Sequence, residues 1–461
     1  MSNDKGSFHG PLRANPCNSR YFTDGTGRAV YLTGSHTWAN LVDVKDQGAP
    51  DFDYDEYLDF MEVHHHNFMR MWAWHHPERV GWTDARVVMD PLPYVRTGPG
   101  LAFDGLPRFD LGRHNPVYFD RLRERVIAAG ERGIYVSVML FEGWCTSYGT
   151  PGTPGHCWPY HPYNVQNNIN GVDGDSDGNG RAKLYSLEVP AAVKFEKAFI
   201  RQVIDTVNDL DNVLYEIINE LRDGGLGLAW QSHMVDYIHE YERTKPKQHP
   251  VGITGEGGNQ HNPDLFATPA DWISPGRGPD SEYKYNPPAA DGSKVILADT
   301  DHLWGHGGTY QWVWKSFLRG LNPIFMDPWG PLAGWGDYAR ARGDRGALNT
   351  RSYRDWGLIR TSMGNTLKFA ERLDLNTMVP HGELASSGYC LADPGEAYLV
   401  YVPDDGQVTV DLSAARNEML VEWFNPRTGE SVTSGSMSGG QPWMLVSPFG
   451  LDVVLYIRAR P

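Results

Sequence analysis

The sequence predicts an α/β protein, a (β/α)8 TIM barrel followed by a small C-terminal antiparallel β-sandwich. From about residue 20 to 380, short apolar strands alternate with helical segments or long loops, and eight strands can be counted. After about residue 385 this alternation gives way to short strands separated by turns such as Asp404-Asp405-Gly406. We therefore expect a barrel with an N-terminal β-hairpin over residues 1–384 and a sandwich over residues 385–461.

The first half of the barrel is expected to contain four strands that end in polar or aromatic residues. These strands are 29–38, 67–74, 133–141 and 212–220. Helices are expected where apolar residues recur on one face, at 52–63, 116–130 and 189–209. Residues 75–114 and 145–185 are rich in turn-forming residues and are expected to be long irregular loops over one face.

The second half continues the alternation. Strands are expected at 250–254, 271–274, 294–299 and 322–327, and helices at 228–243, 309–319 and 351–373. The sandwich strands are expected at 397–402, 407–411, 419–424, 443–446 and 452–457. An open doubly wound sheet is the second interpretation, but no Gly-rich nucleotide fingerprint follows any strand, and the barrel is favoured.

Composition excludes several classes of partner. The chain has 461 residues and a formal net charge of -16, which argues against nucleic acid and anionic membranes. No apolar run is long enough to span a bilayer. The N-terminus lacks a signal peptide, so we expect a cytoplasmic protein or an exported one with its signal removed. The four cysteines form no disulfide scaffold, although Cys145 and Cys157 can pair or remain thiols.

The strand 212–220 ends in the pair Asn219-Glu220, followed by the breaker sequence Asp223-Gly224-Gly225. A carboxylate at the tip of a buried strand is costly, and barrels carry their chemistry at this position. The plainer interpretation is that Glu220 forms an ion pair with Arg222 or another arginine.

Polar and aromatic residues also follow the other strands, and in a barrel these tips converge on one mouth. They are His36, Trp38, Arg70, Trp72, Trp74, Glu142, Trp144, Glu256, Asp299, Asp301, His302, Trp304, Asp327 and Trp329. Glycoside hydrolysis needs two carboxyl groups, one to protonate the leaving oxygen and one to attack the anomeric carbon or activate water. Aromatic rings can stack on sugars and exclude water. The tips therefore indicate a carbohydrate substrate.

Glu220 is the candidate acid/base, and Asn219 is expected to bind a sugar hydroxyl. The second carboxylate is expected on the seventh strand, where Asp299 and Asp301 share one parity and both face the axis if the strand persists. We favour Asp299, which follows the apolar run directly, over Asp301 and then Glu256. The other tip residues are candidates for substrate binding, and some acids are expected to pair with Arg70 or a lysine.

The Asn219-Glu220 ending, Arg70 and an acid after strand seven resemble the clan A glycoside hydrolases, which are retaining barrels. The stretch from Arg20 to Trp38 resembles the apiosidase-like group, and Trp423–Gly429 is similar to the "putative collagen-binding" sandwich that often follows such barrels. Clan A members usually place Glu at the end of strand seven, where this chain has Asp299-Thr300-Asp301. Carboxyl groups about 5–5.5 Å apart imply retention, and a gap of about 6.5–9.5 Å implies inversion.

We expect a glycoside hydrolase whose long loops favour exo action, with no metal and no cofactor. A non-catalytic carbohydrate-binding barrel is one alternative, motivated by the Asp at strand seven. A metal-dependent hydrolase is another, motivated by the histidine runs 64–66 and 75–76, although these lack metalloprotease spacing. Residues 173–178 resemble the start of a calcium loop, but Leu184 stands where an EF-hand has Glu, so an Asx-rich turn is favoured.

Overall fold

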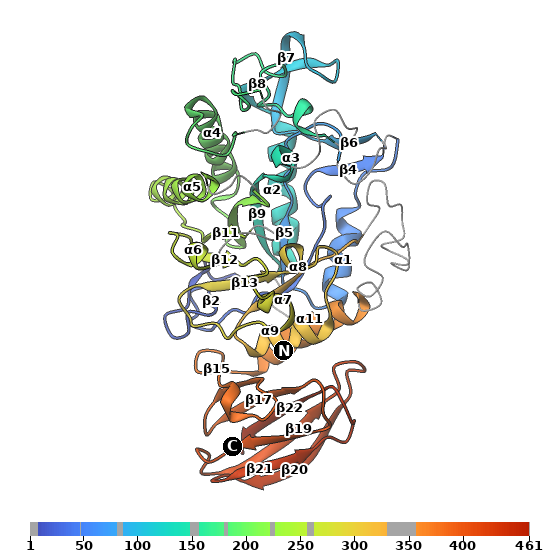
Figure 1. The fold of residues 1–461 in the computed structure, drawn as a ribbon, viewed down its shortest axis with the longest axis vertical. Coiled ribbons are helices and arrows are strands. Elements are labelled where there is room, and N and C mark those ends of the chain that lie inside the picture. Colours follow the sequence, from blue (N-terminus) through green and yellow to red (C-terminus); the bar gives the residue numbers. More distant parts are fainter. Residues whose placement is uncertain are drawn as a thin grey trace.

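The structure, a computed structural model, describes residues 8–46, 48–80, 86–147, 156–178, 183–221, 226–255, 262–329 and 356–460. Eight parallel strands form one sheet in the order β3-β14-β13-β12-β11-β10-β9-β5, and β3 and β5 lie next to each other, which closes the barrel (Figure 1). The strands are β3 (Gly34–His36), β5 (Phe68–Met71), β9 (Tyr135–Glu142), β10 (Val213–Asn219), β11 (Val251–Thr254), β12 (Trp272–Ser274), β13 (Val295–Asp299) and β14 (Asn322–Met326). The predicted fold class is confirmed.

Amphipathic helices surround the barrel. They are α1 (Tyr54–Val63), α2 (Pro116–Glu131), α4 (Pro190–Val207), α5 (Leu226–Glu242), α9 (Tyr310–Leu318) and α11 (Trp356–Arg372), with the short α6 (Asn262–Phe266) and α7 (Glu282–Tyr285) between them. In α4 a proline starts the helix, and Phe199, Val203 and Val207 form part of the buried face. Within the described ranges, no helix has the length and apolarity needed to cross a membrane.

An apolar layer fills the end of the barrel where the strands begin. Phe68, Leu214, Trp272 and Leu297 meet there, and the N-terminal segment with β1 (Arg13–Ala14) and β2 (Phe22–Thr23) covers them. Gly252 is required opposite Trp272, because a Cβ atom at this position would lie 1.9 Å from the indole Cε2. A bulky ring in one strand is thus matched by a glycine in the next.

The N-terminal hairpin differs from the prediction. β2 pairs with β1, and residues 29–33, which we expected to form the hairpin with residues 20–22, meet β2 at a single Phe22–Val30 bridge. The reason is that Leu32 and Thr33 donate their backbone N–H groups to the side chains of Asn322 and Asn67, at 3.0 Å each. The barrel strand β3 is correspondingly shorter than the expected 29–38.

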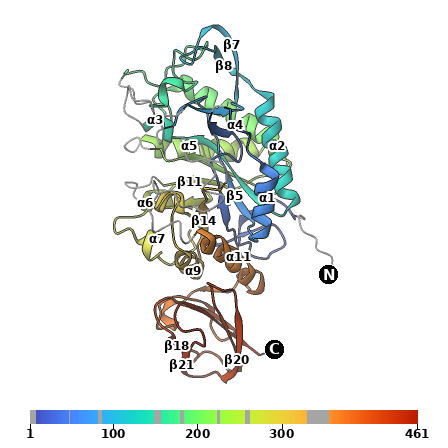
Figure 2. The ribbon, with the colours of Figure 1, turned by 90° about the vertical axis from the view of Figure 1, so that its right-hand side faces the viewer.

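The prediction of an irregular loop over 75–114 is wrong for much of that range. β6 (Val87–Asp90) pairs with β4 (Asp43–Asp46), and β7 (Tyr94–Leu101) forms an antiparallel hairpin with β8 (Pro107–His114). This hairpin projects at the end of the molecule away from the sandwich in both views (Figures 1 and 2). The second long loop packs on it, since Phe109 N–H donates to Asn167 O and Ile169 N–H to Phe109 O.

The C-terminal part is antiparallel, as predicted. A six-stranded sheet has the order β15-β16-β17-β22-β19-β20, and β18 pairs with β21. The strands are β15 (Val379–Pro380), β16 (Cys390–Asp393), β17 (Ala397–Val402), β18 (Gln407–Asp411), β19 (Glu418–Phe424), β20 (Ser431–Ser438), β21 (Pro442–Val446) and β22 (Val453–Ala459), with the 3-10 turn η3 (Gly382–Leu384) after β15. Because β15 already belongs to this sheet, the boundary at 384/385 stays a prediction.

The sandwich is attached to the barrel through α9 and α11 (Figures 1 and 2). Phe424 packs against Trp314 and Phe369, with ring centroids 5.7 and 5.3 Å apart. Both Tyr310 of α9 and Tyr401 of β17 donate hydrogen bonds to the buried carboxylate of Asp452. One apolar cluster therefore runs from the barrel helices into the sandwich.

His75 lies in the core behind β9. Its ring contacts Phe199 and Phe141 at centroid distances of 4.9 and 5.4 Å, and it is completely buried. Burial, with a smaller contribution from His76, lowers the pKa of His75 to about 3. The imidazole is therefore neutral in the folded protein over the physiological range.

We predict that His75 makes stability fall as the pH drops below about 6.5. The folded pKa lies below the unfolded value, so the unfolded chain binds more protons between the two, and stability is full only above the unfolded pKa. His75→Leu should flatten the dependence of the unfolding free energy on pH by up to about 1.4 kcal/mol per pH unit. Urea unfolding between pH 7 and 4 measures this, with the exposed His9→Gln as control. Equal slopes in both variants would contradict the prediction.

Candidate active site

The guanidinium of Arg70, at the inner face of β5, is the centre of the site. It forms two hydrogen bonds with Glu216 of β10, at 2.7 Å from Nε and 2.5 Å from Nη2. Nη1 donates to Asp299 at 2.8 Å and to Asp301 at 3.2 Å, and Nη2 donates to Asn219 at 2.8 Å. Burial alone would lower the pKa of Arg70, but Glu216 and Asp299 raise it above its usual value. The arginine is permanently charged and connects β5 to β10, to β13 and to Asp301, which follows β13.

His36 of β3 extends this network. Its Nδ1 accepts a hydrogen bond from the Trp72 indole at 2.8 Å, so the proton of the neutral ring lies on Nε2, which donates to Asp299 at 3.0 Å. Burial would raise the pKa of Asp299, but His36 and Arg70 lower it below its usual value. Asp299 is thus a fixed, ionised carboxylate.

Asn219, at the end of β10, is oriented from two sides. Its Oδ1 accepts from Arg70 and from Nε2 of His302 at 3.0 Å, and Nδ1 of His302 faces the Ser274 hydroxyl at 3.0 Å. Burial lowers the pKa of His302, which keeps this ring neutral. Because the Asn219 oxygen is occupied, its amide NH2 is the group that can donate to a ligand.

The seventh strand does not persist to Asp301, so strand parity does not direct both aspartates toward the axis. β13 ends at Asp299, and the short helix α8 (Thr300–Leu303) begins at once. Asp299 caps this helix by accepting from the backbone N–H of Asp301 at 2.9 Å. Asp301 nevertheless reaches Arg70, because the first helical turn brings its carboxylate back over the barrel end.

Glu220 directly follows β10 and is half-buried. Its φ of 48° places it in the left-handed region, which is uncommon for a residue other than glycine and occurs often at functional sites. Gly143 permits the turn, since a Cβ atom there would lie 2.6 Å from Leu221 Cα. The N–H of Gly143 also donates to Asn219 O at 2.7 Å. The backbone therefore fixes the direction in which Glu220 leaves the strand.

Among the residues that the structure describes, carboxylates outnumber cations around Arg70. Glu216, Asp299 and Asp301 all contact the single guanidinium, whereas His36 and His302 are neutral. Glu216 was not among the site residues predicted from the sequence. The sequence feature that could have indicated Glu216 is an acidic residue inside an apolar strand, on the same face of the strand as Leu214.

Other predicted site residues make their contacts outside the Arg70 network. Glu142 is fully buried and contacts His76 at 3.1 Å and the backbone N–H of Cys145 at 2.9 Å. Burial alone would lower the pKa of His76, but Cys157 and Glu142 raise it to about 10. Asp327 forms a bidentate pair with Arg360 of α11.

The tryptophans divide into two groups. Trp72, Trp38 and Trp74 form a chain from the Arg70 cluster, with ring centroids 6.3 Å apart between Trp38 and Trp72 and 5.8 Å apart between Trp72 and Trp74. By contrast, Trp329 packs on α1, and Trp304 lies against Trp312. Trp144 begins the short helix α3 (Trp144–Ser147) and is half-buried. Glu256 lies outside the described residues.

The histidine runs do not assemble a metal-dependent hydrolase in the part of the chain that the structure describes. His66 donates to Arg360 O beside α11, whereas His75 lies among aromatic rings behind β9.

In the predicted Asx-rich turn, the backbone N–H of Asp175 donates to the Asp173 side chain at 3.0 Å.

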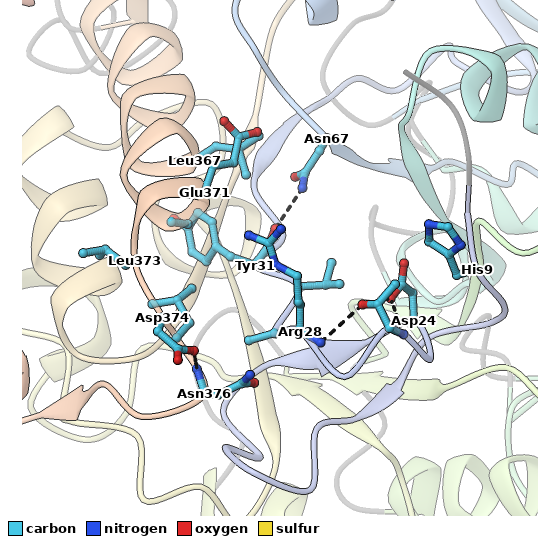
Figure 3. Close-up of a pocket in the computed structure, with 15 residues that line it drawn as sticks. His9, Asp24, Arg28, Tyr31, Asn67, Leu367, Glu371, Leu373, Asp374 and Asn376 are labelled. Atoms are coloured by element: carbon cyan, nitrogen blue, oxygen red, sulfur yellow. Dashed lines mark hydrogen bonds between the residues drawn. The ribbon is translucent and has the colours of Figure 1, made fainter. Parts of the chain in front are cut away.

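Figure 3 shows a pocket of about 340 Å³ that lies away from this cluster. It is lined by Arg28, Tyr31 and Asn67, which precede β3 and β5, and by Asp374 after α11. Asn67 Nδ2 donates to Tyr31 O at 2.8 Å. Because barrel enzymes carry their sites where the strands end, we do not assign this pocket to the chemistry.

Two parts of the chain match known protein families. Residues 70–261 match the family described as "Domain of unknown function (DUF6298)", and residues 376–453 match the "Putative collagen-binding domain of a collagenase". No curated protein matches the sequence.

Solved structures align over nearly the whole chain. One described as "Glycoside hydrolase" has a TM-score of 0.62 at 13% identity and covers 98% of this chain and 97% of its own. A glycoside hydrolase family 5 protein from Bacteroides vulgatus ATCC 8482 has a TM-score of 0.62 at 14% identity, covering 98% and 94%. The chain has a glycoside hydrolase fold. Both alignments span the barrel and the sandwich of this chain.

We predict that Arg70→Met lowers the unfolding free energy by about 3–5 kcal/mol, because it leaves buried carboxylates without their counter-ion. Urea unfolding at pH 7 measures the change. The control is Arg123→Met, which removes a surface pair with Asp209 and should cost less than about 1 kcal/mol. If the two variants had similar urea midpoints, the buried charge of Arg70 would not be needed for the stability of the fold.

Proposed function

We propose that this protein is a retaining glycoside hydrolase with Glu220 as general acid/base and Asp301 as nucleophile. The observation that carries the proposal is the Arg70 network. One guanidinium binds Asn219, the neighbour of Glu220, and also Asp301, so carboxylates from two strand tips meet at the same end of the barrel. Two such groups are what the hydrolysis of a glycosidic bond requires.

The contacts favour Asp301 over Asp299, which we preferred from the sequence. Oδ1 of Asp299 accepts from His36 and from the Asp301 backbone, and Oδ2 accepts from Arg70. Its side chain is 1% exposed, whereas that of Asp301 is 6% exposed and accepts from Arg70 at the longer distance of 3.2 Å. Asp299 therefore acts as a positioning residue that holds Arg70 and His36.

In the proposed first step, Glu220 gives its proton to the glycosidic oxygen while an Asp301 oxygen attacks the anomeric carbon. The bond to the leaving group breaks, and a glycosyl ester forms on Asp301. Glu220 then takes a proton from water, and the resulting attack on the anomeric carbon frees Asp301. The surplus of negative charge around Arg70 favours the oxocarbenium-like transition state, which carries positive charge.

Neighbouring groups suit the binding of a sugar. The Asn219 amide can donate to a hydroxyl beside the reacting carbon, and Trp38, the least buried of the three packed tryptophans, is the one whose ring can contact a sugar. The β7–β8 hairpin and the segment around Asn167 are joined by backbone hydrogen bonds, and we propose that together they close one side of the substrate site. On this basis we infer exo action on short chains.

We expect Glu220→Gln to lower kcat on natural glycosides by about a hundredfold to ten-thousandfold, because the leaving oxygen loses its acid. The loss should be much smaller in the first step for a dinitrophenyl glycoside, whose leaving group needs no proton. A screen of glycans with steady-state kinetics provides the measurement.

The matched control is Glu240→Gln, which neutralises an exposed carboxylate on α5 and should keep full activity. A folded Glu220→Gln variant with unchanged kcat would refute the role of Glu220. A wild-type protein that binds glycans but hydrolyses neither natural nor activated glycosides would assign the barrel to binding alone.

Asp301→Asn should abolish turnover of natural and activated glycosides alike while the urea midpoint changes little. Asp299→Asn should lower the midpoint clearly, because it weakens the contacts with Arg70 and His36. If instead Asp299→Asn keeps its stability and loses all turnover while Asp301→Asn stays active, Asp299 is the nucleophile. NMR of the first-formed anomer tests retention.

A further inference from the structure

A buried group of three metal-ligating side chains lies beside the barrel mouth, outside the proposed catalytic pair. It consists of His76, Cys145 and Cys157, whose ligand atoms all lie within 4.8 Å of one another. All three are buried, and no disulfide joins the two cysteines. They come from three separate segments: the chain after β5, helix α3, and the residue before the 3-10 turn η1 (Trp158–Tyr160).

The surroundings of His76 match those of a metal-bound histidine. Its Nε2 donates to Arg79 O at 3.0 Å, and this bond points Nδ1 toward the cluster. Metal-ligating histidines commonly donate the other ring N–H to a backbone carbonyl, which fixes the ring and its tautomer. The arrangement therefore leaves Nδ1 as the ligand atom.

Glu142 is the candidate for a fourth ligand, and it lies outside the group of three whose atoms are within 4.8 Å of one another. Oε1 of Glu142 lies 3.1 Å from Nδ1 of His76, and its Oε2 accepts from the Cys145 backbone N–H at 2.9 Å. In tetrahedral zinc sites, bonds of about 2.3 Å to sulfur and about 2.0 Å to nitrogen or oxygen place neighbouring ligand atoms roughly 3.3–3.8 Å apart. The ligand atoms of His76, Cys145 and Cys157 already lie within 4.8 Å of one another, so small shifts of these side chains would bring the three atoms to this spacing.

We propose that His76, Cys145 and Cys157, with Glu142 as the fourth ligand, form a structural zinc site. Two sulfurs and an imidazole select zinc over calcium or magnesium, which prefer oxygen. A closed, buried set of protein ligands is typical of a structural site and leaves no position for substrate. On binding, the thiols and His76 Nδ1 release their protons to solvent, and the ion connects the chain after β5 to the loop after β9.

The inference does not depend on the proposed glycosidase activity. The test is the zinc content of the full-length protein after purification, measured by mass spectrometry of the metal. We expect about one zinc per chain in the wild type and less than about a tenth of that in Cys157→Ser and His76→Leu. Cys390→Ser, which removes a buried thiol of the sandwich, and Cys17→Ser, which removes an exposed one, should retain the wild-type content.

A second measurement keeps the proposal testable if the variants fail to fold. Wild-type protein stripped with a chelator should gain a higher urea midpoint when zinc is added back, and calcium or magnesium should have no such effect. The cobalt-substituted protein should show thiolate-to-cobalt charge-transfer absorption. Zinc-free protein whose midpoint zinc does not change would overturn the proposal. So would an unreduced chain lighter by two hydrogens, the mass expected for a Cys145–Cys157 disulfide.

Discussion

The ion pair between Arg70 and Glu216 is the constraint on which the barrel mouth depends. Desolvating a guanidinium is costly, and the cost is offset only when good geometry and further hydrogen bonds satisfy its donors. Here the acceptors come from β10, β13 and α8, so the strands must stay in the register that brings these side chains together. Burial of one charge thus determines the relative positions of the tips that carry the candidate chemistry.

The same network sets the protonation states around it. The indole of Trp72 donates to His36, and burial disfavours the charged form of His302, so both rings remain neutral beside ionised carboxylates. Neutral donors orient Asp299 and Asn219 without cancelling the negative charge. An enzyme whose transition state carries positive charge gains from this arrangement, because the surrounding dipoles need no reorganisation.

Much of the fold could be predicted from the sequence, because helices such as α2 and α4 and strands such as β10 carry strong local patterns. Contacts between side chains that are far apart in the chain were harder to predict from the sequence. Glu216 pairs with a residue on another strand, and Glu142 turns toward His76, and no local pattern records either partner. The seventh strand ends at Asp299 as predicted, but no local pattern showed that the Asp299 side chain caps a helix there and that Asp301 reaches Arg70.

The contacts at the junction limit which sandwich domains can be attached to this barrel. Phenols from both parts meet at the carboxylate of Asp452, and Phe424 packs into the helices of the barrel. A sandwich exchanged for that of a distant relative would bring an unmatched acceptor and an unmatched ring to this seam. A functional exchange of the sandwich would therefore require the contacting faces of α9 and α11 to be exchanged along with it.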